Sequence, residues 1–376
     1  MRGSGLYIHV PFCERKCFYC DFYSVASRRV EEDFLGALER EAGFRRVEWA
    51  GDTLFETLYI GGGTPSLLSI SQLECLLLLV RRNFHLAEDA EMTIEVNPGT
   101  VTEEWLRAAH GLGLNRLSIG AQSFDDGILR WLMRIHTSRE AVRACKDARR
   151  SGFTNLSLDL IYSLPGLSID VWERTLRKAV ELAPEHISAY SLIVEPGTSL
   201  EESVRSGEVE MPGDDAEALS FEFTVDYLAA AGYEQYEVSN YAKRGFRSRH
   251  NVNYWERKPY LGLGPSAHSF RDGVRSWNVP LLDEYIRTLQ EGTLPVAGEE
   301  RLTAAEEMEE IIFLGMRQGK IDLREIEARF NIAAERRWVD RFREWEGLGL
   351  IRLDEGRVLL TRKGLLMAEE LAERLV

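Results

Sequence analysis

Three of the five cysteines of this 376-residue chain, Cys13, Cys17 and Cys20, stand close together in a C-x3-C-x2-C pattern. They follow a short apolar run, 6–10, that is typical of a β-strand. A 4Fe-4S cube has four irons, so three close thiolates can hold three of them and leave the fourth open to a ligand that is not protein. The stretch 5–24 therefore predicts an iron-sulfur site at the end of a strand, to which the fold must bring the other site residues.

Structural zinc and a disulfide framework are the alternatives for these cysteines. Structural zinc normally takes four protein ligands, and no second pair of Cys or His follows at zinc-finger spacing. An odd number of clustered cysteines and an N-terminus without a secretory pattern both oppose a disulfide framework. The remaining cysteines, Cys75 and Cys145, lie in helical patterns and are predicted to be buried.

Composition narrows the class of protein. The chain is 44% hydrophobic and 28% charged, as a globular protein with a sizeable core should be. Its formal net charge of -15 opposes nucleic acid as the main partner, because phosphate binding needs a concentrated basic surface. No apolar run is long enough for a membrane span. We therefore predict a cytoplasmic protein, in a reducing compartment where an iron-sulfur cluster can survive.

From residue 5 to about 240, short β-rich runs alternate with longer amphipathic stretches. This alternation is typical of βα units around a parallel sheet, and six strands predict an α/β fold with an incomplete (β/α)6 TIM-like barrel. The expected strands are 6–10, 57–60, 92–96, 116–119, 156–160 and 187–192, and the expected helices are 30–48, 71–84, 102–110, 138–151 and 171–182.

Polar residues and glycines follow the expected strand ends, where the chemistry of such folds gathers. The glycine run 61–63 would let a ligand lie against backbone amides, although a simple turn is also open. Glu95 and Asp159 stand in apolar strands, where an unpaired charge is costly, so each either binds a ligand or forms a structural ion pair. Gln122 and Arg134 are either part of the same rim or ordinary polar residues.

Two later segments differ in pattern from the barrel. The segment 248–270 is dense in aromatics, glycine, Asn and His, which suits either a flat apolar ligand or packing under the barrel. From about residue 302, three expected helices (304–316, 323–330 and 333–346), a strand pair and a last helix predict a winged-helix-like module. Such modules usually bind DNA, but its mixed charges favour packing or partner docking.

Together these motifs resemble the radical S-adenosylmethionine superfamily and, within it, the HemN/HemW family. The resemblance rests on the cysteine motif, GGGTPS, EVNP, GAQSF, RIH and LDLIYSLPG. It implies a partial barrel with a 4Fe-4S cluster over 1–240, a connecting segment with an H-N-x-x-Y-W element over 241–300, and a winged-helix-like domain over 301–376.

The resemblance also implies roles for single residues. Cys13, Cys17 and Cys20 would ligate the cluster, and S-adenosylmethionine would chelate its fourth iron. Tyr7 would contact the nucleoside, and Gly62 and Glu95 would bind the methionine end. A second S-adenosylmethionine, whose presence here is open, would lie against Tyr19, Gly63, Thr64, Gln122, Arg134 and Asp159.

Two features separate the HemW branch from the HemN branch. Asp21-Phe22 follows the last motif cysteine where HemN has a Cys-x-Cys ending, and 250–255 resembles the HemW element. The HemW branch implies a heme chaperone that delivers heme to acceptor hemoproteins, respiratory ones near a membrane among them, with a homodimer as one candidate form. His250 is then a candidate heme contact, with a packing role as its alternative. The other function is oxygen-independent coproporphyrinogen III oxidase, which the sequence disfavours; S-adenosylmethionine cleavage stays open.

Overall fold

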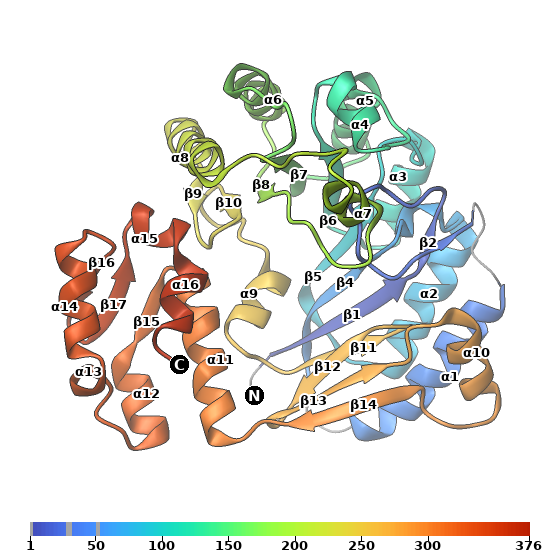
Figure 1. Cartoon of the computed structure of the whole chain (residues 1–376). Helices are drawn as coiled ribbons and strands as arrows, with labels where there is room; N and C mark the ends of the chain where they lie inside the picture. The colour runs from blue at the N-terminus through green and yellow to red at the C-terminus, as the bar shows by residue number, and fades with distance from the viewer. Residues whose placement is uncertain (1–2, 28–31, 50–52) are drawn as a thin grey trace.

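The computed structural model describes residues 3–27, 32–49 and 53–376. Within them, twelve strands form one sheet in the order β14-β13-β12-β11-β1-β4-β5-β6-β7-β8-β10-β9. A separate sheet, β15-β17-β16, lies in the C-terminal part (Figure 1). The central strands are β1 Ser4–Val10, β4 Phe55–Gly62, β5 Leu86–Val96, β6 Arg116–Gln122, β7 Leu156–Tyr162 and β8 His186–Ser191.

The six central strands run parallel from β1 to β8, and each pairs with the next in chain order. Their apolar side chains, such as Leu58, Ile94 and Leu158, are fully buried under helices that connect the strands. This confirms the predicted incomplete βα barrel. The connecting helices are α1 Glu32–Glu48, α2 Ile70–Asn83, α3 Glu103–Gly111, α4 Asp126–Trp131, α5 Ser138–Arg150 and α6 Ile169–Glu181, and α7 Ser199–Arg205 and α8 Asp214–Ala230 follow β8.

Helix boundaries agree with the sequence patterns within a few residues. Among the described helices, three begin with capping boxes, in which Ser69, Thr137 and Thr303 exchange hydrogen bonds with the residue three positions later. The predicted start of the first helix at residue 30 lies outside the described residues.

The prediction that Cys75 is buried is wrong, whereas Cys145 is buried as expected. In α2 the buried residues are Leu73, Leu76, Leu77, Leu79 and Val80, most of which recur at helical spacing. Cys75 falls between these positions and faces outward. The continuous apolar run around it concealed which side of the helix would pack.

The segment 241–300 extends the sheet at its β1 edge. It contains α9 Arg249–Trp255, β11 Tyr260–Leu263, β12 His268–Arg271, β13 Val274–Asn278, α10 Leu282–Gln290 and β14 Val296–Arg301. At the opposite edge of the sheet, β10 Asn240–Ala242 pairs with β8 and with β9 Glu234–Gln235. Strand β11 pairs in parallel with β1, and the three following strands are antiparallel. The strand that leads to the cysteines is therefore internal to the sheet, with a neighbour on each side.

The carboxylate of Glu41 on α1 fastens this extension to the barrel. It is fully buried and accepts hydrogen bonds from the Gly264 amide (2.9 Å), the Asn278 side chain (2.7 Å) and the Tyr285 hydroxyl (2.6 Å). Burial raises the pKa of Glu41, and these hydrogen bonds oppose the rise. One carboxylate thus satisfies donors from three places in the extension.

The C-terminal part has its own hydrophobic core, built around Trp338, Phe342 and Trp345. The predicted helix 333–346 is in fact two helices, because the backbone of Trp338 leaves the helical region while its side chain enters the core. The separate core supports our proposal of a domain boundary near residue 301. The elements are α11 Ala304–Arg317, β15 Lys320–Asp322, α12 Leu323–Phe330, α13 Ala334–Arg337, α14 Val339–Gly347, β16 Ile351–Asp354, β17 Arg357–Leu360, α15 Arg362–Leu366 and α16 Ala368–Glu373.

Replacement Glu41→Ala is expected to lower the free energy of unfolding by about 3 kcal/mol, because it leaves buried donors without an acceptor. Urea unfolding followed by circular dichroism measures the change. Glu39→Ala on the exposed side of the same helix is the control and should change stability by less than about 0.5 kcal/mol. Equal effects of the two substitutions would contradict this assignment of Glu41.

Candidate functional site

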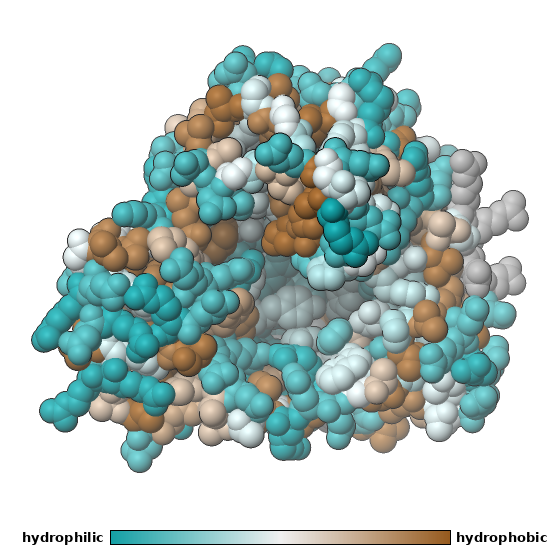
Figure 2. Space-filling view, viewed as in Figure 1, coloured by the Kyte–Doolittle hydropathy of each residue, from teal (hydrophilic) through white to brown (hydrophobic). Residues whose placement is uncertain are grey.

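A cavity of about 390 Å³ opens at the carboxyl ends of the parallel strands. Figure 2 shows the face of the molecule hollowed at its centre, in the region where Figure 1 shows β1, β4 and β5. Most of the sequence-predicted site residues line this cavity. They are Cys13, Cys17, Tyr19, Cys20, Gly62, Gly63, Thr64, Glu95, Gln122, Arg134 and Asp159.

The three motif cysteines lie on one wall of the cavity, and two of their sulfurs have hydrogen-bond donors. Thr64 Oγ1 lies 3.5 Å from the sulfur of Cys13, and Arg134 Nη1 lies 3.4 Å from that of Cys17. Both donors favour a thiolate, the form that binds iron. Within the described residues, no three His, Cys, Asp or Glu side chains are placed to hold a single ion. A cube, in which each sulfur binds a different iron, fits these cysteines better than zinc does.

The glycine run brings the end of β4 against the chain that carries the cysteines. Amides of Gly63 and Thr64 donate to the carbonyls of Val10 (2.8 Å) and Phe12 (2.7 Å). A Cβ at Gly63 would lie 2.6 Å from the Phe12 carbonyl oxygen, closer than real atoms approach. These amides are therefore committed to the protein. What the glycines provide to the cavity is space, rather than the free amides that the sequence pattern predicted.

Glu95, at the end of β5, has a hydrogen-bond donor at each of its two carboxylate oxygens. Its carboxylate accepts hydrogen bonds from the Tyr59 hydroxyl (2.9 Å) and from the Gly62 amide (3.1 Å). Burial raises the pKa of Glu95 to about 7; the Tyr59 hydrogen bond opposes this rise, and the nearby Asp159 charge adds to it. A cationic group entering the cavity would stabilise the ionised form, so Glu95 is suited to bind an ammonium.

Asp159 on β7 is a second buried acid, held by serines rather than by a cation. The Ser118 hydroxyl lies 3.0 and 3.1 Å from its two oxygens, and the Ser157 hydroxyl 3.3 Å from one of them. Burial is the largest influence on the pKa of Asp159 and raises it. A structural ion pair was the alternative for this acid, and within the described residues no cation lies within ion-pair distance.

Gln122 and Arg134 meet above the end of β6. Gln122 has a φ of 62°, in the left-handed region, directly after the register shift that interrupts the β6–β7 pairing. A positive φ is rare in residues other than glycine, and it occurs where the backbone must direct a side chain into a functional site. Arg134 donates to the Gly120 carbonyl (2.9 Å) as well as to Cys17, so it ties the end of β6 to the cysteine wall.

Tyr7, the predicted nucleoside contact, does not line the cavity. Its hydroxyl lies 3.1 Å from Nδ1 of His9, whose Nε2 lies 2.9 Å from the Tyr23 carbonyl. Since the carbonyl can only accept, Nε2 carries the proton of His9 and Tyr7 is the donor. The Tyr7 ring stacks on the Tyr59 ring, with 6.2 Å between the ring centroids. Tyr7 therefore supports Tyr59, which donates a hydrogen bond to Glu95.

His250, the candidate heme contact, is also outside the cavity lining. Its side chain is 2% exposed, and both ring nitrogens have partners: Nδ1 lies 2.7 Å from Thr57 Oγ1 and Nε2 3.0 Å from the Tyr254 hydroxyl. The imidazole ring stacks on the Tyr59 ring, with 5.0 Å between the ring centroids. Burial lowers the pKa of His250 to about 3, so the ring is neutral. In this arrangement His250 packs beneath the site, and ligation of iron would require both hydrogen bonds to break.

Several cavity residues were missed by sequence reasoning, and most of them come from strands. Along β6 the period of two places Arg116, Ser118, Gly120 and Gln122 on the cavity side, while Leu117 and Ile119 enter the core. Counting back from Gln122 by twos would have found Arg116 and Ser118. The other missed lining residues include Tyr59, Asn97, Ser188, Tyr190, Ile193 and Asn251.

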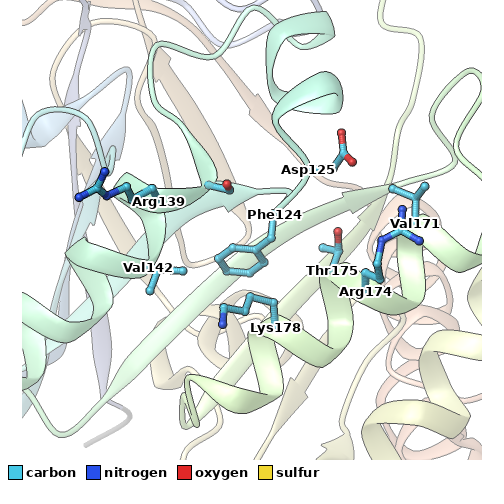
Figure 3. A pocket seen from close by; sticks show the side chains of 9 residues that line it. Phe124, Asp125, Arg139, Val142, Val171, Arg174, Thr175 and Lys178 are labelled. Carbon is cyan, nitrogen blue, oxygen red and sulfur yellow. The ribbon is translucent and has the colours of Figure 1, made fainter.

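A second hollow, of about 420 Å³, lies outside the barrel between α5 and α6. Figure 3 shows the Phe124 ring there, between Val142 of α5 and Lys178 of α6. Asp125 on its rim already accepts from the Gly127 and Ile128 amides as the cap of α4. Phe124, the last residue of the GAQSF motif, lines this hollow, but none of the predicted site residues does.

The comparisons with known proteins agree with this geometry. Residues 7–179 match the Radical SAM superfamily, and residues 302–367 match the HemN C-terminal domain. The structure of coproporphyrinogen III oxidase (HemN) from Escherichia coli, a radical SAM enzyme, superposes with a TM-score of 0.86 at 25% identity. The match covers 100% of this chain and 90% of that one. Fold, cysteine motif and site together define a radical S-adenosylmethionine protein.

Curated relatives narrow the family. The heme chaperone HemW of Bacillus subtilis is 36% identical over 371 residues, covering 98% of this chain and 97% of the relative. The heme chaperone HemW of Escherichia coli is 43% identical over 274 residues, covering 72% of this chain and 71% of the relative. This chain belongs to the HemW family. Membership implies a 4Fe-4S cluster and S-adenosylmethionine as cofactors, and the three thiols and the buried acid fit both.

Replacement Cys17→Ala is expected to abolish the broad visible absorbance of the cluster after anaerobic reconstitution, because one iron loses its thiolate. Cys75→Ala, which removes an exposed cysteine on α2, is the control and should retain the full spectrum. A complete cluster in the Cys17 variant would refute the ligand assignment.

The raised pKa of Glu95 predicts that S-adenosylmethionine affinity changes with pH. As pH falls from about 7.5 to about 6, the carboxyl gains a proton and no longer accepts a hydrogen bond from the ligand's amino group as a carboxylate, so affinity should fall severalfold. Anaerobic calorimetry on the cluster-loaded protein measures this slope. Glu95→Gln should bind weakly with little pH dependence, and an unchanged slope in this variant would exclude Glu95 as its cause.

Proposed function

We propose that this chain is a heme chaperone of HemW type, which binds heme and delivers it to acceptor hemoproteins. The observation that carries the proposal is the similarity to curated heme chaperones over nearly the whole chain. The sequence next to the cluster supports it, because Asp21 and Phe22 stand where the HemN branch has a further cysteine. Phe22 is 62% exposed on the cavity wall, available to an apolar ligand.

The cavity supports specific roles for its residues in this proposal. Cys13, Cys17 and Cys20 would hold the cluster, and Glu95 would accept a hydrogen bond from the amino group of the S-adenosylmethionine that binds the open iron. When bound, the cluster supplies the electron needed for radical chemistry. The side chains proposed to contact a second S-adenosylmethionine share this one cavity, which supports a second occupant there. They are Tyr19, Thr64, Gln122, Arg134 and Asp159, with Gly63 of the glycine run.

The cellular setting is part of the same proposal. Within the described residues, no helix is long and apolar enough to cross a membrane. We infer a cytoplasmic protein that meets respiratory hemoproteins at the membrane surface, and a homodimer as the candidate form for transfer. His250 stays a hypothesis for heme contact, because its ring would first have to leave Thr57 and Tyr254.

Coproporphyrinogen III oxidation is the second candidate function. It is favoured by the TM-score of 0.86 with the oxidase of Escherichia coli, whose barrel and cluster motif this chain shares. The two functions require the same cofactors and differ only in the molecule that binds beside them, heme or coproporphyrinogen III. A direct comparison of the two activities therefore decides between them.

The test uses one batch of anaerobically reconstituted protein in two assays. We expect heme binding and transfer to an apo-hemoprotein, and no decarboxylation of coproporphyrinogen III above background. Decarboxylation at an ordinary enzymatic rate without heme transfer would refute the chaperone function. A His250→Ala arm of the heme titration tests the axial-ligand hypothesis, which fails if heme affinity is unchanged.

A further inference from the structure

Arg116 lies at the floor of the cavity. It is the first residue of β6, so its side chain is the deepest in the cavity-facing series Arg116, Ser118, Gly120, Gln122. The side chain is 2% exposed, yet it lines the cavity. A long cationic side chain has thus been placed inside the barrel, where an apolar residue would be the ordinary filling.

The Arg116 guanidinium has no hydrogen-bond acceptor within the described residues. Its Nε is buried without a partner, and its other nitrogens form no hydrogen bond or ion pair with the described residues. Its charge is still near enough to Glu95 and Asp159 to lower the pKa of both. Glu95 is held by Tyr59 and Gly62 instead, and Asp159 by serines. A buried guanidinium without acceptors is costly, and a bound anion would offset the cost.

The other cations of the cavity differ from Arg116 in this respect. Arg134 is already committed to the Gly120 carbonyl and to Cys17, while Arg15 and Lys16 are exposed at the mouth. Arg134 leaves only its Nε without a partner, whereas no nitrogen of the Arg116 guanidinium donates to a described residue. A guanidinium presents a planar fork of donors that matches a carboxylate in two parallel hydrogen bonds.

The arrangement of charge along the cavity favours a carboxylate as the missing acceptor. The acids Glu95 and Asp159 stand nearer the mouth, and the cation stands below them, with the small side chain of Ser188 on the neighbouring wall. A ligand that carries a carboxylate at its inner end would pass the acids and pair with Arg116. Smaller side chains at 118, 120 and 188 leave room for it to reach that depth.

We propose that Arg116 is an anion subsite that receives a carboxylate of the second ligand bound in this cavity. This inference rests on the proposed function, because that function brings two carboxylate-bearing molecules to the cavity. One is a further S-adenosylmethionine, through its amino-acid end; the other is heme, through a propionate. The first S-adenosylmethionine is not the source, since its carboxylate would be used at the iron.

The test compares ligand pairs that differ only in the carboxylate. Hemin is compared with hemin dimethyl ester by anaerobic titration of the cluster-loaded full chain and of Arg116→Met. S-adenosylmethionine is compared with its decarboxylated analogue in the same way, on protein whose first site already holds S-adenosylmethionine. Removing the carboxylate should weaken binding to the unsubstituted protein by roughly 10- to 100-fold for the pair that uses the subsite. In Arg116→Met the same change of ligand should have almost no effect.

Each outcome decides the proposal. If Arg116→Met removes the affinity difference between hemin and its dimethyl ester, the occupant is a propionate. If it removes the difference between S-adenosylmethionine and its decarboxylated analogue, the occupant is the amino-acid end. If the variant weakens acid and ester forms equally, Arg116 only balances the charge of Glu95 and Asp159, and the proposal is overturned. Unchanged binding of all four ligands overturns it as well.

Controls separate this result from loss of fold or of function. Arg341→Met removes an exposed cation of the C-terminal part and should leave both ligand pairs unchanged. The cluster spectrum and circular dichroism of Arg116→Met should match those of the unsubstituted protein. If they do not, Arg116→Lys is titrated instead, because it keeps the positive charge but lacks the planar pair of guanidinium donors. If the unsubstituted protein neither binds nor transfers heme, the proposed function fails while the S-adenosylmethionine pair still tests the subsite.

Discussion

The site depends on the close approach of two backbone segments. The glycine run after β4 lies against the chain between β1 and the cysteines, where the Gly63 and Thr64 amides meet the carbonyls of Val10 and Phe12. A side chain at Gly63 would collide with the Phe12 carbonyl, so glycine is required by contact rather than by turn geometry. This contact brings the cysteine loop next to Glu95, since the same glycine run donates to the Glu95 carboxylate through Gly62.

A second layer of aromatic and polar residues holds Glu95 from below. Tyr59 donates to Glu95 and its ring stacks on the rings of both Tyr7 and His250. His250 is in turn fixed by Thr57 and Tyr254. His250 thus acts on the site through packing, while Asn251 of the same element lines the cavity. Two motifs that are far apart in the sequence, the strand before the cysteines and the H-N-x-x-Y-W element, meet at one tyrosine ring.

The sheet extension completes this support. Because β11 covers the outer edge of β1, the strand that leads to the cysteines is paired on both sides. Glu41 joins the extension to α1 through buried hydrogen bonds, so the extension cannot shift without leaving donors unsatisfied. The connecting segment expected from sequence is in fact part of the frame that holds the site.

The sequence alone determined the barrel strands, the strand-end position of most site residues, the clustering of the cysteines that we propose as cluster ligands, and the family. Periodicity and motif spacing are local properties, and they survive without knowledge of the fold. Tertiary structure alone decided that Cys75 faces outward, that the glycine amides are already committed, that His250 packs under Tyr59, and that Arg116 reaches the cavity floor without an acceptor. Each of these depends on which residues from distant segments come into contact, and no local pattern records that.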